Sequence, residues 1–323
     1  MAIKVLEAGL STSVQDQGRP GYYHLGIPIS GGMDLYALTA ANLSVGNPAE
    51  AAVLEATFLG PELEFTTDAV VAVTGAAMTP RVDRANQDNW ASFPIKAGQV
   101  LNFDFLKGGA RAYIAVSGGI DVPLVLGSRS TYGLGALGGF DGRALQAGDE
   151  VALGSDGTAT PGKSVPEALR RQLGNPVELR ALTGIYWHRV TKQSGTGFFN
   201  DTWKVAPEAD RIGYRFRGGE SLNFVDREQP FGVGSDPSNI VDGCYPYGSI
   251  QVPGGTEPIV LHRDAVSGGG YFMLGTVISA DMDLIGQLQP NMPCKFISVT
   301  MEQALAARAD RNTMLANMQE ALA

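Results

Sequence analysis

An amide and a carboxylate, Asn239 and Asp242, stand three positions apart in the segment "SDPSNIVDGCYPYG". A carboxylate can take the proton from a weakly acidic N–H, while an amide can orient a neighbouring carbonyl group. This pairing suits a substrate that reacts through an amide-like nitrogen, so we select both as candidate catalytic residues. The same part of the chain supplies two candidate binding residues, Tyr245 and His262.

Two glycine-rich segments hold further polar candidates. In "LGSRSTYG", Arg129 follows Ser128 and is followed by more hydroxyl residues, Tyr132 among them. An arginine among hydroxyl groups can hold a carboxylate or a carbamate through two parallel hydrogen bonds. In "DQGRPGYYHLGIPISGGMD", Ser30 is a candidate binding residue, and Asp34 is a candidate carboxylate for proton handling or loop anchoring. Both segments could instead serve only as surface turns.

One adjacent pair of opposite charges, Asp210 and Arg211 in "APEADRIGYR", is given a structural role instead. We predict that these two side chains form an internal ion pair, so neither is a candidate for catalysis.

The stretch "YGLGALGG" matches the glycine spacing of a dinucleotide-binding loop, at Gly133, Gly135 and Gly138. That pattern binds a pyrophosphate only where a strand precedes it and a helix begins on it. The residues that follow, "GFDGRALQAGDEVAL", contain glycines and aspartates that break a helix. We therefore predict turns between short strands here, and no nucleotide bound by this chain.

Metal and thiol chemistry find little support in the sequence. The three histidines, His24, His188 and His262, are far from one another and from both cysteines, Cys244 and Cys294. A catalytic zinc ion needs at least three convergent protein ligands, so we predict no metal site. Cys244 has no histidine close in sequence to activate it, which predicts a buried, inert thiol.

Composition limits the classes of partner. The chain has 323 residues and a formal net charge of -9, and nucleic-acid binding requires clustered Lys and Arg, so a nucleic-acid partner is not expected. No apolar run approaches the roughly 20 residues that cross a bilayer, so no membrane partner is expected. The segment "MAIKVLEAGL" lacks a signal-peptide apolar region, and the cysteines are too few for a disulfide framework. These features predict a cytoplasmic protein.

The chain alternates short apolar segments with glycines, of which it has 42, and this is typical of a mainly β protein. Two segments favour helices: 34–45, with Asp34 as N-cap, and 301–322. The polar segment 155–175 is predicted to be a connection with a short helix at 166–173. Eight segments are predicted to be strands: 69–78, 98–106, 110–119, 149–154, 176–184, 248–255, 257–264 and 293–300.

The two halves of the chain share an order of motifs. "AVSGGIDVPLVLGSRS" begins at Ala115, and "AVSGGGYFMLGTVIS" begins at Ala265. Each is preceded by an Arg-x-Gly-Tyr motif and followed by a Leu-Gln pair. An internal repeat of this kind predicts two related β-barrel domains, which we place at residues 1–165 and 166–323.

Several long segments, in order, resemble the KipA-like, or allophanate hydrolase subunit 2, family. They include "SVQDQGRPGYYHLGIPISGGMD", "RAYIAVSGGIDVPLVLGSRSTY" and "GSIQVPGGTEPIVL", and the resemblance extends to about residue 300. This family includes the C subunit of 5-oxoprolinase and the C-terminal half of the carboxyltransferase domain of urea carboxylase. The resemblance implies two cyclophilin-like β-barrels with few helices.

The same resemblance implies a component of a biotin-dependent carboxyltransferase. The biotin would be carried on another chain or domain, loaded by a biotin carboxylase, and a KipI-like protein would complete the enzyme, with a downstream hydrolase as a further partner. The carboxyl group would pass to the nitrogen of an amide, lactam, urea or guanidine-like acceptor. The segment 235–247 is closer to the urea-carboxylase branch than to the oxoprolinases, which leaves the acceptor open.

In that reaction, hydrogen-bond donors would stabilise the ureido oxygen of biotin as an enolate, and a base would remove the acceptor proton. The resemblance assigns Ser128, Arg129 and Tyr132 to biotin or carboxylate contacts, and Asn239 and Asp242 to the acceptor side. The base could belong to the partner. Two other functions stay open: a non-enzymatic regulator that binds a kinase or a KipI-like inhibitor, and a peptidyl-prolyl isomerase.

Overall fold

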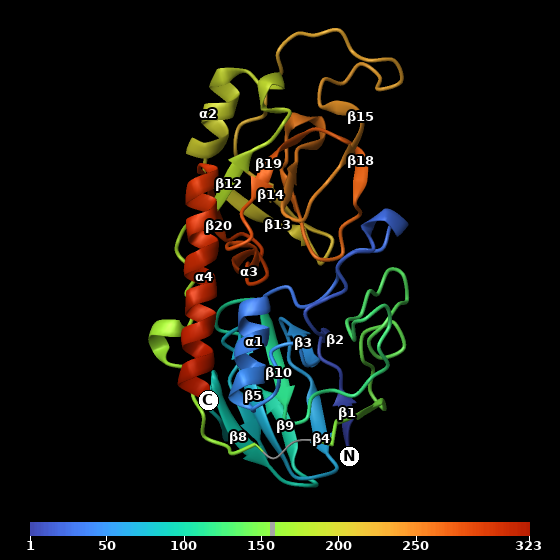
Figure 1. The fold of residues 1–323 in the computed structure, drawn as a ribbon, viewed down its shortest axis with the longest axis vertical. Coiled ribbons are helices and arrows are strands. Elements are labelled where there is room, and N and C mark those ends of the chain that lie inside the picture. The colour runs from blue at the N-terminus through green and yellow to red at the C-terminus, as the bar shows by residue number, and fades with distance from the viewer. Residues whose placement is uncertain (156–158) are drawn as a thin grey trace. The chain divides into compact units, whose positions relative to one another are not determined.

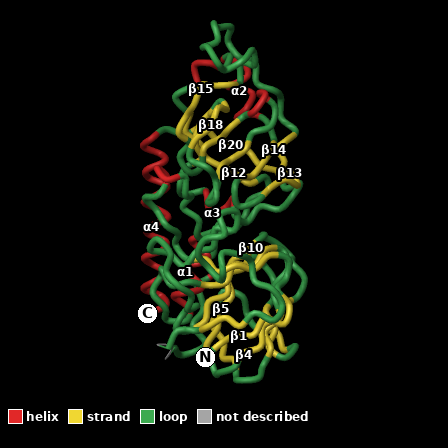
Figure 2. Tube along the Cα trace, turned by 90° about the vertical axis from the view of Figure 1, so that its right-hand side faces the viewer, coloured by secondary structure: helices red, strands yellow, loops and turns green. Residues whose placement is uncertain are grey.

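The computed structural model describes residues 1–155 and 159–323. The chain forms two compact units (Figure 1). The first consists of Met1–Pro20, Ser30–Gln172 and Asn312–Ala323, and the second of Gly21–Ile29 and Leu173–Arg311. Strands and loops dominate both units, and helices are few (Figure 2).

The first unit is built from two antiparallel sheets. The six-stranded sheet has the order β11 (Glu150–Ala152), β1 (Ala2–Glu7), β4 (Glu62–Phe65), β9 (Val100–Phe103), β6 (Pro80–Val82) and β7 (Ala85–Asn86). The five-stranded sheet has the order β2 (Ser11–Gln15), β3 (Val53–Thr57), β10 (Arg111–Val116), β5 (Ala69–Gly75) and β8 (Ala91–Ile95).

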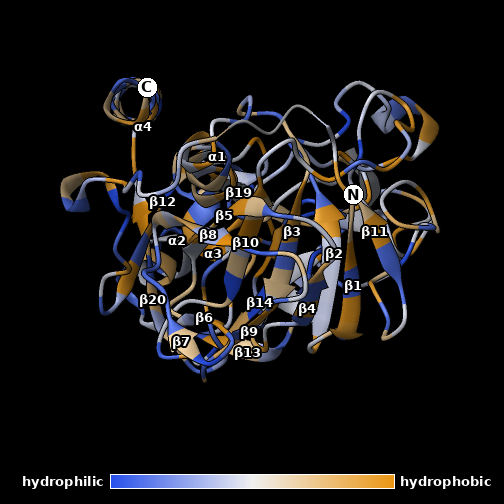
Figure 3. Ribbon diagram, turned by 90° about the horizontal axis from the view of Figure 1, so that it is seen from below, coloured by the Kyte–Doolittle hydropathy of each residue, from blue (hydrophilic) through white to orange (hydrophobic). Residues whose placement is uncertain are grey.

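One apolar core lies between these two sheets. Ile3 and Leu63 enter it from the six-stranded sheet, and Leu54, Val73 and Ile114 enter it from the five-stranded sheet. Buried and less buried residues alternate along β4, and bands of apolar and polar residues are visible along the strands (Figure 3). This alternation follows from the period of two in a strand, which sends successive side chains to opposite faces.

Helix α1 (Leu35–Ser44) covers the other face of the five-stranded sheet. Ala37, Leu38 and Ala41 pack there against strand residues. The helix begins because Asp34 accepts a hydrogen bond from the backbone N–H of Ala37 (2.9 Å), as an N-cap does. It ends before Gly46, whose φ of +70° favours glycine. The helix predicted over 34–45 is confirmed.

The second unit contains a closed seven-stranded barrel. Its strands follow one another around the barrel as β12 (Val177–Thr183), β19 (Met273–Val277), β16 (Ser249–Gln251), β17 (Ile259–Leu261), β14 (Gly213–Arg217), β13 (Trp203–Ala209) and β20 (Pro293–Ser298). The parallel pairing of β12 with β20 closes the ring. Phe198, from helix α2 (Lys192–Asn200), stacks on Phe296 with 4.9 Å between ring centroids and so anchors that helix on the barrel.

Smaller elements complete the second unit. A separate two-stranded ribbon pairs β15 (Asn239–Cys244) with β18 (Gly268–Tyr271). Helix α3 (Met282–Ile285) follows the last residues of β19. Among the described residues, the short 3-10 helices are Tyr23–Leu25, Trp187–Arg189 and Pro253–Gly255 in this unit and Glu167–Leu169 in the first.

Helix α4 (Met301–Leu322) contributes residues to both units. Ala304 and Ala307 pack into an apolar cluster of the second unit. Met318 and Leu322 pack against Tyr36 of the first unit. Lys163 of the first unit donates hydrogen bonds to the last two carbonyl groups of the chain.

The predicted mainly β fold, with few helices and a C-terminal helix over 301–322, is confirmed. Each of the eight predicted strand segments contains an observed strand, whereas the short helix expected at 166–173 is a single 3-10 turn. The second unit has a closed barrel, and the first encloses its core between two sheets. The division into domains at residues 165 and 166 stays a prediction.

Candidate functional site

The carboxylate of Asp16 organises the loops of the first unit. It accepts hydrogen bonds from the backbone N–H of Gly18 (2.8 Å) and from the hydroxyl of Ser128 (2.6 Å). The backbone N–H of Arg129 (2.5 Å) and the hydroxyl of Ser130 donate to it as well. Ser128 and Ser130 are completely buried. Three of these four donors come from the loop at 128–130 and fix it onto the turn that follows β2, with Ser128 facing Asp16.

Arg19 extends this buried network toward the glycine-rich stretch. Its guanidinium is 1% exposed and donates to the backbone oxygen of Ser130. Gly138 has a φ of +68°, and a Cβ there would lie 2.3 Å from that same oxygen. The segment around it forms turns, with Tyr132 and Leu137 paired through their backbones (2.8 and 3.1 Å), and no helix begins on it. The predicted turns are confirmed, and Gly138 is required by close packing.

Two of the candidate binding residues lie at the edge of this network. The side chain of Arg129 donates to the backbone oxygen of Val122 (2.8 Å) and lies 3.4 Å from the carboxylate of Asp121. About a third of the surface of this side chain is exposed to solvent, so it can contact a ligand. Tyr132 is half-buried, and its ring lies so close to Gly135 that a Cβ there would be 2.6 Å away.

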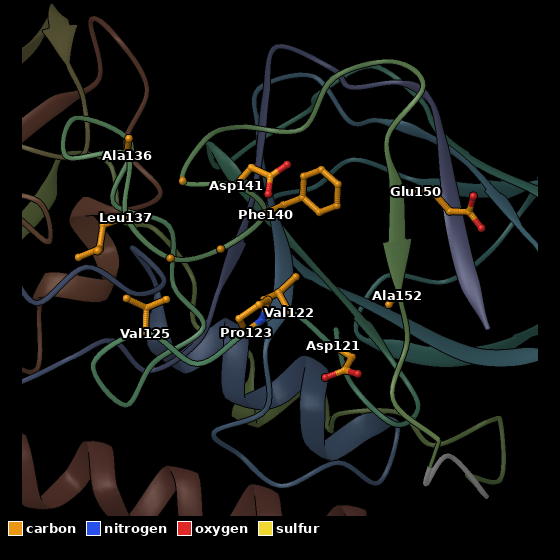
Figure 4. A pocket seen from close by; sticks show the side chains of 13 residues that line it. Asp121, Val122, Pro123, Val125, Ala136, Leu137, Phe140, Asp141, Glu150 and Ala152 are labelled. Carbon is orange, nitrogen blue, oxygen red and sulfur yellow. The ribbon is translucent and has the colours of Figure 1, made fainter.

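A pocket of about 420 Å³ opens beside these loops (Figure 4). One wall is the turn that contains Val122 and Pro123, and another is the loop that contains Phe140 and Asp141. The lining residues are Asp121, Val122, Pro123, Val125, Ala136, Leu137, Gly138, Gly139, Phe140, Asp141, Gly142, Glu150 and Ala152. Because Arg129 contacts the first wall and Gly138 packs on Arg19, the buried network sets the shape of the pocket.

An ion pair lies at the end of the loop that contains Phe140 and Asp141, and its contribution to stability should depend on pH. Arg143 donates to both carboxylate oxygens of Asp149 (2.7 and 2.9 Å), and these hydrogen bonds lower the pKa of Asp149. A carboxylate with a lowered folded-state pKa adds stability above its unfolded pKa, about 4, and loses it as the pH falls through the folded value. We expect the melting temperature of the wild type to fall more steeply below pH 4 than that of Asp149→Asn.

The matched control is Asp141→Asn, because Asp141 is exposed and lies 4.0 Å from the same guanidinium. Its melting curve should follow the wild type at every pH. Parallel curves for Asp149→Asn and the wild type would show that the Arg143 pair adds no stability that depends on pH.

The loop at residues 30–34 is held from beneath by a buried carboxylate. Glu55 on β3 accepts hydrogen bonds from the backbone N–H of Met33 and the hydroxyl of Tyr113, each at 2.8 Å. The backbone N–H of Asp34 donates to the same hydroxyl (2.7 Å). Burial, followed by the charge of Glu55, raises the pKa of Tyr113 well above its usual range. The phenol therefore stays protonated and joins the loop to the sheet.

Ser30 begins this loop in a strained conformation. Its φ is +55°, which is unusual for a serine, and its side chain is completely buried. Within the described residues its hydroxyl has no hydrogen-bond partner. The backbone N–H of Gly32 donates to the backbone oxygen of Asp16 (3.0 Å), which links this loop to the Asp16 network. Strain and an unsatisfied hydroxyl at the same residue are features of functional loops.

The candidates on the ribbon of the second unit are held locally. Asn239 donates from its side chain to the backbone oxygen of Val233 (3.1 Å). Asp242 is exposed and accepts from the backbone N–H of Gly243 (2.9 Å). In the part of the chain that is described, no hydrogen bond joins Asn239 to Asp242. Their pairing at one acceptor stays a prediction.

Tyr245 and His262 are buried in the second unit. The hydroxyl of Tyr245 donates to the backbone oxygen of Tyr271 (2.6 Å) and accepts from its N–H (2.8 Å), and burial raises its pKa. His262 has its Nε2 3.1 Å from the backbone oxygen of Met282. A carbonyl oxygen only accepts, so Nε2 carries the proton. Both side chains are thereby held in fixed positions.

Two sequence-based expectations are wrong. Cys244 is exposed, since β15 lies in a two-stranded ribbon outside the barrel, whereas Cys294 is buried and its pKa is raised by burial to about 12. Arg211 pairs with Asp264, 2.8 Å from its Nε, and not with the adjacent Asp210. Asp210 instead accepts from backbone N–H groups of its own turn.

Residues 1–155 and 159–323 contain no group of three or more His, Cys, Asp or Glu side chains arranged to hold a metal ion. No helix in these residues is long and apolar enough to span a membrane.

The family model described as "Carboxyltransferase domain, subdomain A and B" matches residues 25–298, which is most of the chain. The chain belongs to this carboxyltransferase family. The resemblance inferred from the motifs is thereby confirmed. Ser30, Asp34 and the 128–132 loop of this carboxyltransferase domain lie inside the matched range, whereas Asp16 precedes it.

Two groups of relatives share this domain. The C subunit of the Escherichia coli 5-oxoprolinase is 38% identical over 311 residues, which cover 96% of this chain and 95% of that protein. The urea amidolyase of Saccharomyces cerevisiae is 31% identical over 326 residues, 98% of this chain but 18% of that protein. The crystal structure of the K. lactis urea amidolyase matches with a TM-score of 0.92 at 32% identity, over 98% of this chain and 20% of that one. The chain thus spans about a fifth of the urea amidolyases.

Proposed function

We propose that the chain is one component of a biotin-dependent carboxyltransferase and moves a carboxyl group from carboxybiotin to the nitrogen of an amide, lactam, urea or guanidine-like acceptor. Its similarity to two groups of relatives supports this most directly. The names of both groups refer to a substrate with an amide-type nitrogen, 5-oxoproline in one and urea in the other. Biotin would arrive on another chain or domain, loaded by a biotin carboxylase, and a KipI-like protein would complete the enzyme.

The proposed reaction exchanges one N–C bond for another. The bond between biotin N1 and its carboxyl group breaks, and the electron pair moves toward the ureido oxygen while CO₂ is released. A base removes a proton from the acceptor nitrogen, which attacks the CO₂, and biotin N1 takes up a proton. Donors directed at the ureido oxygen lower the first barrier, and confinement of CO₂ beside the acceptor favours the second step.

The loops of the first unit supply groups of the required kind. Ser30 carries a buried hydroxyl that has no partner in the described part of the chain, on a backbone fixed through Met33 and Asp34 to Glu55 and Tyr113. We assign Ser30, Arg129 and Tyr132 to contacts with biotin or with the transferred carboxylate. Ser128 would act by positioning, since its hydroxyl is committed to Asp16. Asn239, Asp242, Tyr245 and His262 remain our proposal for the acceptor side.

Asp34 has two proposed roles that one pair of variants separates. Asparagine caps helices about as well as aspartate, so Asp34→Asn should keep the free energy of unfolding within about 0.5 kcal/mol, whereas Asp34→Ala should lose about 1 kcal/mol. If the carboxylate moves a proton, Asp34→Asn should still lower kcat by about tenfold to a hundredfold. Urea denaturation and steady-state kinetics of both variants measure this. Full activity in Asp34→Asn would mean that Asp34 transfers no proton and serves only as the N-cap of α1.

Reconstitution tests the function as a whole. The chain would be mixed with its KipI-like partner, a biotin carboxylase, a biotinylated carrier, ATP and bicarbonate. ATP turnover would be measured with 5-oxoproline, urea and guanidine as separate acceptors. We expect one of them to stimulate turnover, and only when this chain is present. If none does while the chain binds the KipI-like protein tightly, the regulator is the better description.

A further inference from the structure

A buried arginine in the second unit lacks a counter-charge among residues 1–155 and 159–323. Arg263 is 7% exposed, and its buried Nε has no hydrogen-bond partner within the described part of the chain. The described residues offer its guanidinium no hydrogen bond and no carboxylate within ion-pair distance. Its guanidinium carbon lies 4.7 Å from the centroid of the Tyr247 ring. A buried charge without a partner is strongly unfavourable, and native proteins satisfy such groups with an ion or a ligand.

The nearby carboxylates are already paired with other arginines. Asp264, next in sequence to Arg263, lies 2.8 Å from Nε of Arg211. Asp283 lies 2.6 Å from Nε of Arg311. Arg263 is therefore the surplus positive charge of this group.

Tyr247 adds a second unsatisfied donor at the same place. Its hydroxyl is buried and has no hydrogen-bond partner within residues 1–155 and 159–323. Burial raises the pKa of this phenol well above its usual range, so the hydroxyl keeps its proton at neutral pH. The ring is held edge-on against His262, with 5.2 Å between centroids. Two neighbouring donors, one charged and one neutral, thus have no acceptor among the residues that the structure describes.

We infer that Arg263 and Tyr247 form a binding site for the carboxylate of a small organic anion. A guanidinium that stacks on a ring leaves its planar edge free for two parallel hydrogen bonds, the geometry that a carboxylate matches. The single positive charge of Arg263, unpaired within the described residues, is neutralised by an anion that carries one negative charge. The charges of Asp264 and Asp283 close by oppose a phosphate dianion. The inference does not depend on the proposed carboxyl transfer, because binding can be measured without the partner proteins.

The test uses the full chain and acetate as the probe, with bicarbonate and inorganic phosphate in parallel at constant ionic strength and pH. Acetate is expected to raise the melting temperature of the wild type by about 5 °C at one hundred times its Kd. Arg263→Met should show no rise, and Tyr247→Phe a smaller one. Arg215→Gln is the matched control, because Arg215 pairs with Glu257 on the same barrel at 3.1 Å and is partly exposed. It should respond to acetate as the wild type does.

A second measurement uses no ligand. Because Arg263→Met removes an uncompensated buried charge and keeps much of the side-chain volume, its melting temperature without carboxylates should equal or exceed that of the wild type. Arg263→Lys keeps the charge but loses the planar fork, and its acetate affinity should fall about tenfold. An equal acetate response in Arg263→Met and the wild type would overturn the inference. So would a larger response to phosphate than to acetate, no response of the wild type, or a loss of stability in Arg263→Met.

Discussion

Replacing Asp16 by asparagine should destabilise the first unit by about 3 kcal/mol, the amount typical of breaking a buried, charged hydrogen-bond network. Four donors converge on this carboxylate, and an amide would turn an NH₂ group toward at least one of them. The loop at 128–130 would shift, and since small displacements of positioning groups are costly, carboxyl transfer should fall about a hundredfold. Urea denaturation and reconstituted turnover measure the two effects.

Asp210→Asn is the matched control. Asp210 also accepts backbone N–H groups within a turn, from Ile212 (2.8 Å) and Gly213 (3.1 Å), but it is exposed. Water can replace its hydrogen bonds, so its loss of stability should stay below about 1 kcal/mol. Equal losses in the two variants would mean that burial adds nothing to the Asp16 network.

Replacing Glu55 by glutamine should cost the first unit about 3 kcal/mol as well. Glu55 is 2% exposed, accepts from Met33 and Tyr113, and lies 3.6 Å from the guanidinium of Arg111, itself nearly buried. The neutral amide would remove the carboxylate charge that faces this buried arginine. Tyr113→Phe removes one neutral donor and should cost about 1 to 2 kcal/mol. Urea denaturation of both single variants and the double variant measures the coupling.

The control for Glu55 has the same ion-pair distance in a different environment. Glu64 lies 3.6 Å from Lys4, but both side chains are partly exposed. Exposed pairs contribute about 0 to 1 kcal/mol, so Glu64→Gln should be nearly neutral. If both variants lost the same amount, the distance between the charges would matter and their burial would not.

Local features of the fold can be predicted from the sequence. The cap at Asp34 acts within one turn of the helix that it begins, and the helix over 301–322 is predicted from the spacing of apolar residues along that segment. The strand segments can be found because apolar residues and glycines alternate within ten positions. Tertiary packing agrees with these local preferences in both units. The helices and strands can therefore be predicted without knowing which residues pack against them.

The candidate site depends on contacts that the sequence does not display. Asp16 meets Ser128 across 112 positions, and Arg211 meets Asp264 across 53. Adjacency in the sequence does not predict such pairs, since Arg211 is next to Asp210 but pairs with Asp264. Glu55 did leave a signal, a charged residue inside the apolar run "AAVLEATFLG", since a charge within a strand of this kind is expected to be paired.

The division of α4 between the units bears on how the chain folds as it is synthesised. Tyr36 and Ala40 belong to a cluster that Met318 and Leu322 complete. All of Leu173–Arg311 is translated before those two residues leave the ribosome. Until then this apolar patch on α1 lacks its cover, so an unfinished chain exposes a surface that a chaperone can bind.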